Sequence, residues 1–134
     1  MWLVEGMASL YELPDFDSEP GQVHGKVDFR RDILLNALKD PKRAKRVSLD
    51  GLLALGNDEF RDPEWESLSY AVAREAMRWL DSQGRLWAWY SAWRDGVLGD
   101  ISGEKAFEKV MGETSAEGTE AWVEWLNGAR PGPK

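Results

Sequence analysis

An acidic side chain, Glu5, interrupts the otherwise apolar segment WLVEGMASLYE at residues 2–12. Apolar residues recur along this segment at helical spacing, which predicts a helix over 2–12. Glu5 lies off their stripe, beside the small residues Gly6, Ala8 and Ser9. Small residues let another element approach closely, and a carboxylate held against a packed surface needs a metal ion, an arginine or water as its partner. The alternative is a solvated acid on an amphipathic helix, paired with a lysine.

A second polar group that could do chemistry is Tyr70. The stretch from 63 to 82 predicts the longest helix, which Asp62 caps and Gly84 ends. Tyr70 lies off the main apolar stripe of this helix and close to its start. That position suits a hydroxyl group that points into a cleft. The alternative is a tyrosine that covers a second packed face of the helix.

Helical periodicity continues along the rest of the chain, and no stretch alternates as a strand over four or more residues. The predicted helices cover approximately residues 2–12, 28–40, 48–55, 63–82, 85–95, 103–111 and 115–127. Within the last helix, Ala121, Trp122, Trp125 and Leu126 are expected to face inward. The segment 14–25 is rich in Pro, Gly and Asp and predicts an irregular loop. The fold class is therefore all-α, with one compact multi-helix domain over 1–128 and a disordered tail over 129–134.

Composition narrows the classes of function. The chain has 134 residues, of which 43% are hydrophobic and 31% charged, so it should fold as one domain. Its eight Trp residues allow a sizeable core. A net charge of −7 argues against nucleic acid or an anionic membrane as partner, and no apolar run is long enough to span a membrane. Without cysteine, neither a disulfide framework nor a cysteine-based metal site can form.

The segment 2–12 resembles the W-L-x-E-G-x-A-x-x-x-E segment of gluzincin metallopeptidases, the group that includes aminopeptidases with a His-Glu-x-x-His zinc helix. The resemblance implies that Glu5 is the third zinc ligand, on a helix that packs against the zinc helix. The stretch 68–80, LSYAVAREAMRWL, is similar to the family segment whose tyrosine hydrogen-bonds the oxyanion of the tetrahedral intermediate. This implies the same catalytic role for Tyr70. The two residues are 65 positions apart (70 − 5), close to the family's usual separation.

The C-terminal part carries a similar resemblance. The stretches AFEKVMG at 106–112 and WVEWL at 122–126 resemble the end of peptidase-MA-like domains. Together the matched segments span nearly the whole chain, from Trp2 to Leu126. The order and spacing of these segments are more specific than any one of them. The resemblance therefore implies the all-α architecture of the C-terminal helical subdomain of gluzincins.

The chain departs from the family in the residues that would complete a zinc centre. It contains no His-Glu-x-x-His, and its single histidine, His24, lies in the predicted loop with no acidic or histidine partner at metal-ligand spacing. Catalytic zinc needs about three protein ligands, so Glu5 alone would not hold it. No general base is present to activate a metal-bound water. The residues after Tyr70 also differ from the family's usual Lys-Gly pair.

These observations lead to one function and one alternative. The chain is interpreted as the C-terminal helical portion of a zinc metallopeptidase-like domain, a peptide-bond hydrolase that is inactive in this form. Zinc and a peptide substrate would bind only the complete domain, and no cofactor is expected in this chain alone. The partner would be the missing N-terminal half. The alternative is a non-enzymatic helical protein-interaction module derived from the same scaffold.

The absence of a metal helix predicts self-association. Trp2 and Ala8 would be exposed as an apolar patch on the N-terminal helix, and such a patch favours a two-fold homodimer. The alternative is that the loop 14–25 folds over the patch and the chain remains a monomer.

Two weaker signals have simpler explanations. The basic run at 42–46 could contact phosphates, but on an acidic chain a solvated connection is the simpler interpretation. Aromatic residues in the predicted helix at 85–95 could line a substrate groove. Core packing is expected for Tyr90 and Trp93, with either Trp87 or Trp89 partly exposed.

Overall fold

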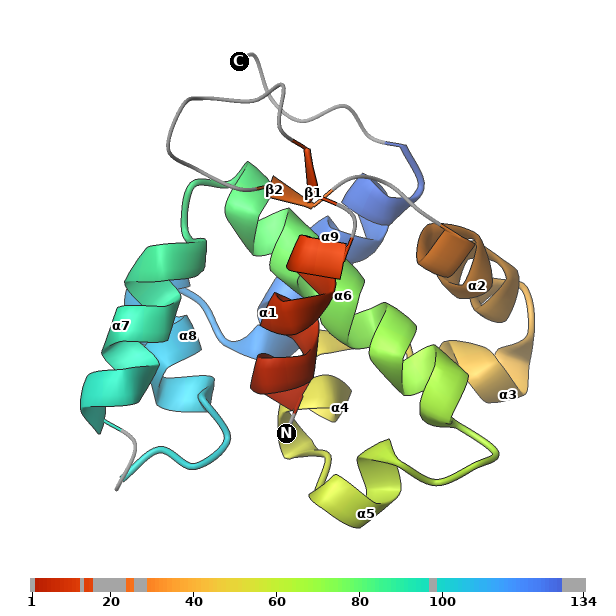
Figure 1. Cartoon of the computed structure of the whole chain (residues 1–134), viewed down its shortest axis with the longest axis horizontal. Coiled ribbons are helices and arrows are strands. Elements are labelled where there is room, and N and C mark those ends of the chain that lie inside the picture. The colour runs from red at the N-terminus through yellow and green to blue at the C-terminus, as the bar shows by residue number, and fades with distance from the viewer. Residues whose placement is uncertain (1, 13, 16–23, 26–28, 97–98, 129–134) are drawn as a thin grey trace.

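The longest helix, α6 (Glu66–Ser82), runs through the middle of the molecule and contacts most of the other elements (Figure 1). The computed structural model describes residues 2–12, 14–15, 24–25, 29–96 and 99–128, and the side chains of residues 5–10, 29–96 and 99–128. The other described helices are α1 (Trp2–Glu12), α2 (Phe29–Leu38), α3 (Pro41–Ala44), α4 (Leu49–Ala54), α5 (Asn57–Phe60), α7 (Leu86–Gly96), α8 (Glu104–Met111) and α9 (Ser115–Leu126). The prediction of an all-α fold is confirmed.

The elements pack around α6 in a simple arrangement. Helices α1 and α2 lie along α6, and α4 and α9 contact both it and each other. Helix α7 touches α6 and pairs with α8, as the left side of Figure 1 shows. Strands β1 (Pro14–Asp15) and β2 (His24–Gly25) form a two-residue antiparallel pair inside the segment predicted as an irregular loop. The side chain of His24 and the tail 129–134 lie outside the described residues.

Helix α6 is buried along most of its length because it is surrounded by other helices. Its predicted apolar stripe is buried, at Leu68, Val72, Ala76, Trp79 and Leu80. The prediction is wrong at its N-terminal end, where Trp65 precedes the helix rather than forming part of it. The residues after Asp62 form a turn first, in which the Asp62 carbonyl accepts hydrogen bonds from the N–H groups of Trp65 and Glu66, both at 2.8 Å. Asp62 therefore caps a turn, and α6 begins at Glu66.

Two one-turn helices, α3 and α5, were not predicted. Helix α3 forms within the basic run because Asp40 accepts the N–H of Lys42 at 3.0 Å and Pro41 suits the first helical position. Helix α5 begins at Asn57, where the Glu59 carboxylate accepts the N–H of Gly56 at 3.4 Å. Gly56 therefore caps a second short helix directly after α4. Both elements depend on a single local capping contact, which hydrophobic periodicity does not detect.

The C-terminal helix α9 matches its prediction closely, with one correction. Thr114 and Glu117 form a capping box, in which each side chain accepts the other's backbone N–H, at 3.2 and 2.9 Å. Trp122 and Leu126 are buried, but Ala121 is exposed. The prediction that Ala121 faces inward is therefore wrong. The face of α9 that packs on the core is narrower than the number of apolar residues in this helix indicates.

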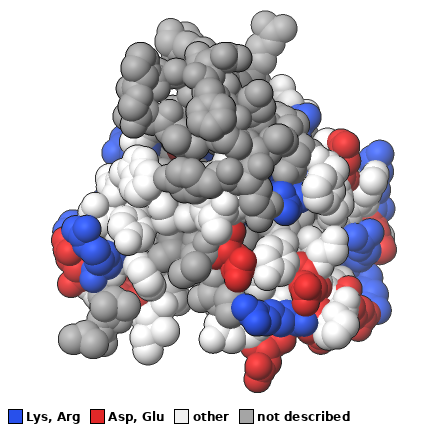
Figure 2. Space-filling view, in the orientation of Figure 1, with Lys and Arg blue, Asp and Glu red and all other residues white. Residues whose placement is uncertain are grey.

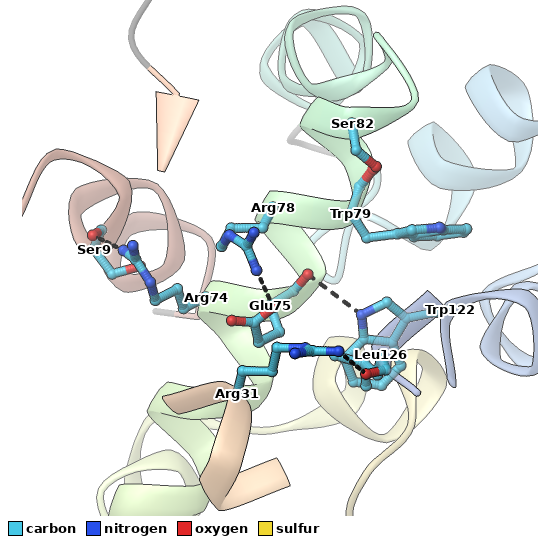
Figure 3. A network of polar contacts seen from close by, with 9 residues as sticks. All are labelled: Ser9, Arg31, Arg74, Glu75, Arg78, Trp79, Ser82, Trp122 and Leu126. Atoms are coloured by element: carbon cyan, nitrogen blue, oxygen red, sulfur yellow. Dashed lines mark hydrogen bonds and ion pairs between the residues drawn. The ribbon is translucent and has the colours of Figure 1, made fainter. Parts of the chain in front are cut away.

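Buried polar contacts join α6 to α1. The Arg74 guanidinium is fully buried and donates a hydrogen bond to the backbone carbonyl of Ser9 (Figure 3). The Ser9 hydroxyl in turn donates to the carbonyl of Gly6 at 2.6 Å. A buried cation needs such partners, because leaving it without them is costly. These contacts fix α1 against the middle of α6.

A second set of polar contacts joins α6 and α2 to α9. Arg78 and Glu75 form an ion pair at 2.7 Å, and the indole N–H of Trp122 donates to the backbone carbonyl of Glu75 at 3.3 Å (Figure 3). Arg31 of α2 donates to the carbonyl of Leu126 at 2.9 Å. Three helices far apart in the sequence are therefore held together by polar as well as apolar contacts.

Candidate functional site

The structure brings Glu5 and Tyr70 together. Glu5 lies in the first turn of α1 and Tyr70 in the first turns of α6. Their side chains are half-buried, and the Tyr70 hydroxyl interacts with the Glu5 carboxylate. A proximity between residues 65 positions apart in the sequence is not a consequence of local structure, since it requires α1 to pack on α6 in one particular register.

Arg61 supplies a positive charge at this pair. Its guanidinium lies 3.7 Å from the Glu5 carboxylate, and the two side chains are 57% and 27% exposed. An arginine is one of the partners considered for Glu5, and the structure places Arg61 in that position. An ion pair this exposed adds little to stability, about 0–1 kcal/mol. Its main effect is to place a positive charge beside Glu5 and Tyr70. Arg61 ends the short helix α5, and sequence patterns did not single it out.

Phe60 positions the ring of Tyr70. The two rings meet edge to face with their centroids 4.9 Å apart, and Phe60 is fully buried. Such a contact orients the tyrosine ring while leaving its hydroxyl end at the carboxylate. Phe60 is the one apolar residue in the charged stretch NDEFRDPE, and that isolation is the sequence signal that could have identified it.

The surroundings of Tyr70 favour its neutral form. Burial raises the pKa of the Tyr70 phenol above 10.0, and the negative charge of Glu5 raises this pKa further. Arg61 lowers it, Glu66 raises it and the hydrogen bond to Glu5 also raises it. The phenol therefore remains a hydrogen-bond donor at neutral pH. This is the protonation state that stabilising an oxyanion would require.

Gly6 allows the close approach of α1 and α6. A Cβ atom at this position would lie 2.9 Å from the carbonyl oxygen of Ala73 and 2.9 Å from Cγ of Met77. The small residues beside Glu5 were expected to face another element, and for Gly6 and Ser9 that element is α6. Ala8, in contrast, is exposed, whereas the side chain of Trp2 lies outside the described residues.

The residues that the structure describes do not by themselves fit a zinc ion. Among the residues that the structure describes, no group of three His, Cys, Asp or Glu side chains is placed to hold a metal. Glu5 is a suitable single ligand, but its carboxylate already faces Arg61 and Tyr70. Catalytic zinc requires about three protein ligands, so the donor set here is incomplete.

The aromatic residues of α7 serve mainly the core. Trp89 is fully buried and its indole N–H donates to the carbonyl of Gly103 at 3.3 Å. Trp87 is 48% exposed, which confirms that one of these two tryptophans lies partly in solvent. Tyr90 and Trp93 are half-buried and pack against the core. The pockets beside Leu52 and beside Ala92 are both lined by other side chains than these four.

The comparisons with known proteins assign no relative. No family model, curated protein or solved structure matches this chain. Within the described residues, no helix is both long enough and apolar enough to cross a membrane.

Proposed function

We propose that the chain is the C-terminal helical portion of a zinc metallopeptidase-like domain and does not hydrolyse peptides alone. In this proposal Glu5 is one zinc ligand of the complete domain, and Tyr70 donates a hydrogen bond to the oxyanion formed from the peptide carbonyl. The observation that supports it is the contact between the Tyr70 hydroxyl and the Glu5 carboxylate, across 65 positions of sequence. A metal ligand and an oxyanion donor must both reach one reacting group, so they must lie close together.

The remaining ligands would come from outside this chain. A His-Glu-x-x-His helix packed beside α1 would supply two histidines and the general base. Zinc, when bound there, would polarise the peptide carbonyl and activate water. On the side of this chain, Gly6 and Ser9 hold α1 on α6, and Phe60 orients Tyr70. Binding of zinc to Glu5 would break the ion pair between Glu5 and Arg61, because the metal would take the place of Arg61.

The experiment uses a longer polypeptide that contains this chain after a His-Glu-x-x-His segment. Glu5→Ala is expected to abolish stoichiometric zinc, measured by atomic absorption after dialysis. Tyr70→Phe is expected to retain zinc and to lower kcat for peptide hydrolysis by about a hundredfold, because it removes one oxyanion donor. Tyr90→Phe is the matched control and should change neither quantity. Retention of zinc and activity in Glu5→Ala would overturn the proposal.

A second candidate function is a non-enzymatic helical interaction module. The observation that favours it is that Arg61 already compensates the charge of Glu5 in this chain, at 3.7 Å. In that case Glu5 and Arg61 would be a structural pair. Isothermal titration of the chain with Zn²⁺ at neutral pH, expected to show no stoichiometric site of micromolar affinity, fits both candidates. Only the longer polypeptide distinguishes them.

A further inference from the structure

A pocket of about 150 Å³ lies on a different side of α6 from Glu5 and Tyr70. Leu52, Leu55, Leu68 and Val72 give it apolar walls, and the buried residue Ser69 also lines it. An apolar cavity of about 150 Å³ is large enough to admit benzene, so this pocket has room for one leucine or phenylalanine side chain.

Two residues of the basic run at 42–46 lie at the border of the pocket. Lys45 and Arg46 both line it, and the guanidinium of Arg46 stacks over the ring of Trp65 at 4.0 Å from the centroid. Stacking occupies the face of a guanidinium and leaves its N–H edge able to donate to a planar anion such as a carboxylate. The aromatic ring therefore holds Arg46 in a position from which it can bind a carboxylate.

An acidic group completes the border. Glu59 lines the pocket, and its Oε1 accepts the N–H of Gly56 at 3.4 Å. That contact holds the carboxylate in place, while its second oxygen remains able to accept one more N–H. The two cations and one anion give the border a net charge of +1, which favours a ligand of net charge −1.

From these features we propose that the pocket binds the C-terminal residue of a peptide with an apolar side chain. The side chain would enter the apolar pocket, the terminal carboxylate would bind Arg46 and Lys45, and the amide N–H would donate to Glu59. This inference goes beyond the proposed hydrolase function and does not depend on Glu5 or Tyr70. It also gives the basic run a specific function.

The net charge and the N–H donors of the ligand distinguish an acylated C-terminal residue from a free amino acid and from a short fatty acid. A free amino acid has the same side chain and carboxylate, but its ammonium makes it neutral overall, so it matches the net charge of the border less well. A short fatty acid is an anion with an apolar tail, but it has no N–H for Glu59. The acylated residue satisfies all three features of the pocket and, unlike the free amino acid, also matches the net charge of the border.

The test is a titration of the ¹⁵N-labelled full chain with small probes, followed by amide chemical shifts. N-acetyl-leucine is expected to shift the amides of Gly51, Leu55 and Ser69, all of which line the pocket. N-acetyl-leucinamide, which lacks the carboxylate, should bind at least about tenfold more weakly because a charge-assisted hydrogen bond is lost. Free leucine and hexanoate should also bind more weakly than N-acetyl-leucine. Equal binding of hexanoate, or no shift with any probe, would overturn the proposal.

Substitutions then test whether Arg46 binds the carboxylate of the ligand. Arg46→Gln is expected to lower the affinity for N-acetyl-leucine by about tenfold or more, since the substitution removes one charged donor. Lys39→Gln removes an exposed cation that does not line the pocket, and should leave binding unchanged. Leu55→Trp should block the pocket by filling it from a half-buried position. If Arg46→Gln and Lys39→Gln weaken binding equally, the attraction is a general charge effect and the proposed site is wrong.

Discussion

Gly6 of α1 lies so close to Ala73 of α6 that a Cβ atom would come within 2.9 Å of the Ala73 carbonyl oxygen. This contact sets the distance between the two helices that carry Glu5 and Tyr70. This oxygen is a backbone atom of a buried helix, which cannot move cheaply, and Cγ of Met77 lies equally close at 2.9 Å. A side chain at position 6 would therefore push the two helices apart.

The first prediction is that Gly6→Ala lowers the free energy of unfolding by about 1 kcal/mol, and that Gly6→Val lowers it more. Overpacking costs about 1–3 kcal/mol and offsets the gain in helix propensity. Gly96→Ala is the matched control, because a Cβ there meets no described atom within 4 Å. Urea denaturation followed by circular dichroism measures both. Equal stability of the Gly6 and Gly96 variants would contradict the close approach.

The second prediction concerns the titration of Tyr70. Its pKa lies above 10.0 because of burial and the charge of Glu5, so Glu5→Gln should lower this pKa. Ultraviolet difference titration of the chain and of Tyr70→Phe isolates this tyrosine from Tyr11 and Tyr90. Glu120→Gln, an exposed substitution on α9, is the control and should have no effect. An unchanged tyrosine titration in Glu5→Gln would show that the two groups do not interact.

The same shift has a consequence for stability, with a definite sign. The folded protein holds the Tyr70 proton more tightly than the unfolded chain does. The contribution of Tyr70 to stability is therefore fully present below pH 10 and is lost as the pH rises through the folded pKa. Tyr70→Phe should remove this alkaline dependence, which denaturation measured across an alkaline pH series would detect. An alkaline slope that is the same in both proteins would assign the effect to other groups.

The third prediction concerns the start of α9. Thr114→Ala should lower the free energy of unfolding by about 1 kcal/mol, because it removes the cap on the N–H of Glu117. Separately, the Glu117 carboxylate accepts the backbone N–H of Thr114, and this contact lowers the pKa of Glu117. The stability that the Glu117 carboxylate adds is therefore present above the ordinary carboxyl pKa and is lost as the pH falls through the folded value. Glu120→Ala in the same helix is the control and should change stability by less than about 0.5 kcal/mol. Thermal and urea denaturation at two pH values test both statements.

The fourth prediction is that the chain forms a two-fold dimer through α1. Ala8 is exposed on this helix, and we expect it to form part of an apolar surface that favours association. Ala8→Glu should weaken the dimer by placing a charge at its centre, whereas Ala88→Glu, on the exposed surface of α7, should not. Sedimentation equilibrium over a concentration series measures the association. A monomer mass up to roughly millimolar concentration would rule the dimer out.

The sequence alone was sufficient for the elements that carry their own signals. Ser48 lies at the start of the helix predicted over 48–55 and caps α4 by accepting the N–H of Gly51 at 3.1 Å, and Gly84 and Gly112 follow α6 and α8 with positive φ. Periodicity identified the all-α class and most of the core, because the apolar face of a helix repeats every three to four residues. One-turn helices are too short to repeat, so α3 and α5 were missed.

The sequence predicted only some of the contacts that the charged surface residues make. Figure 2 shows basic and acidic side chains interspersed along the edge formed by α3 and α5. The basic run looked like a solvated connection because its partners are distant in sequence. Arg46 faces Trp65, and Lys42 lies 3.7 Å from Glu64, so neither pairing could be inferred from local pattern.

What only the tertiary structure decided is which groups meet at Glu5. The sequence pointed to Glu5 and Tyr70 separately and, by resemblance, to a shared role. It contained no signal for Arg61, which reaches Glu5 from the end of a one-turn helix. Periodicity reports which face of a helix is buried but not which helix covers it. The register between α1 and α6 depends on the packing of Gly6 on Ala73, a contact between residues far apart in the chain.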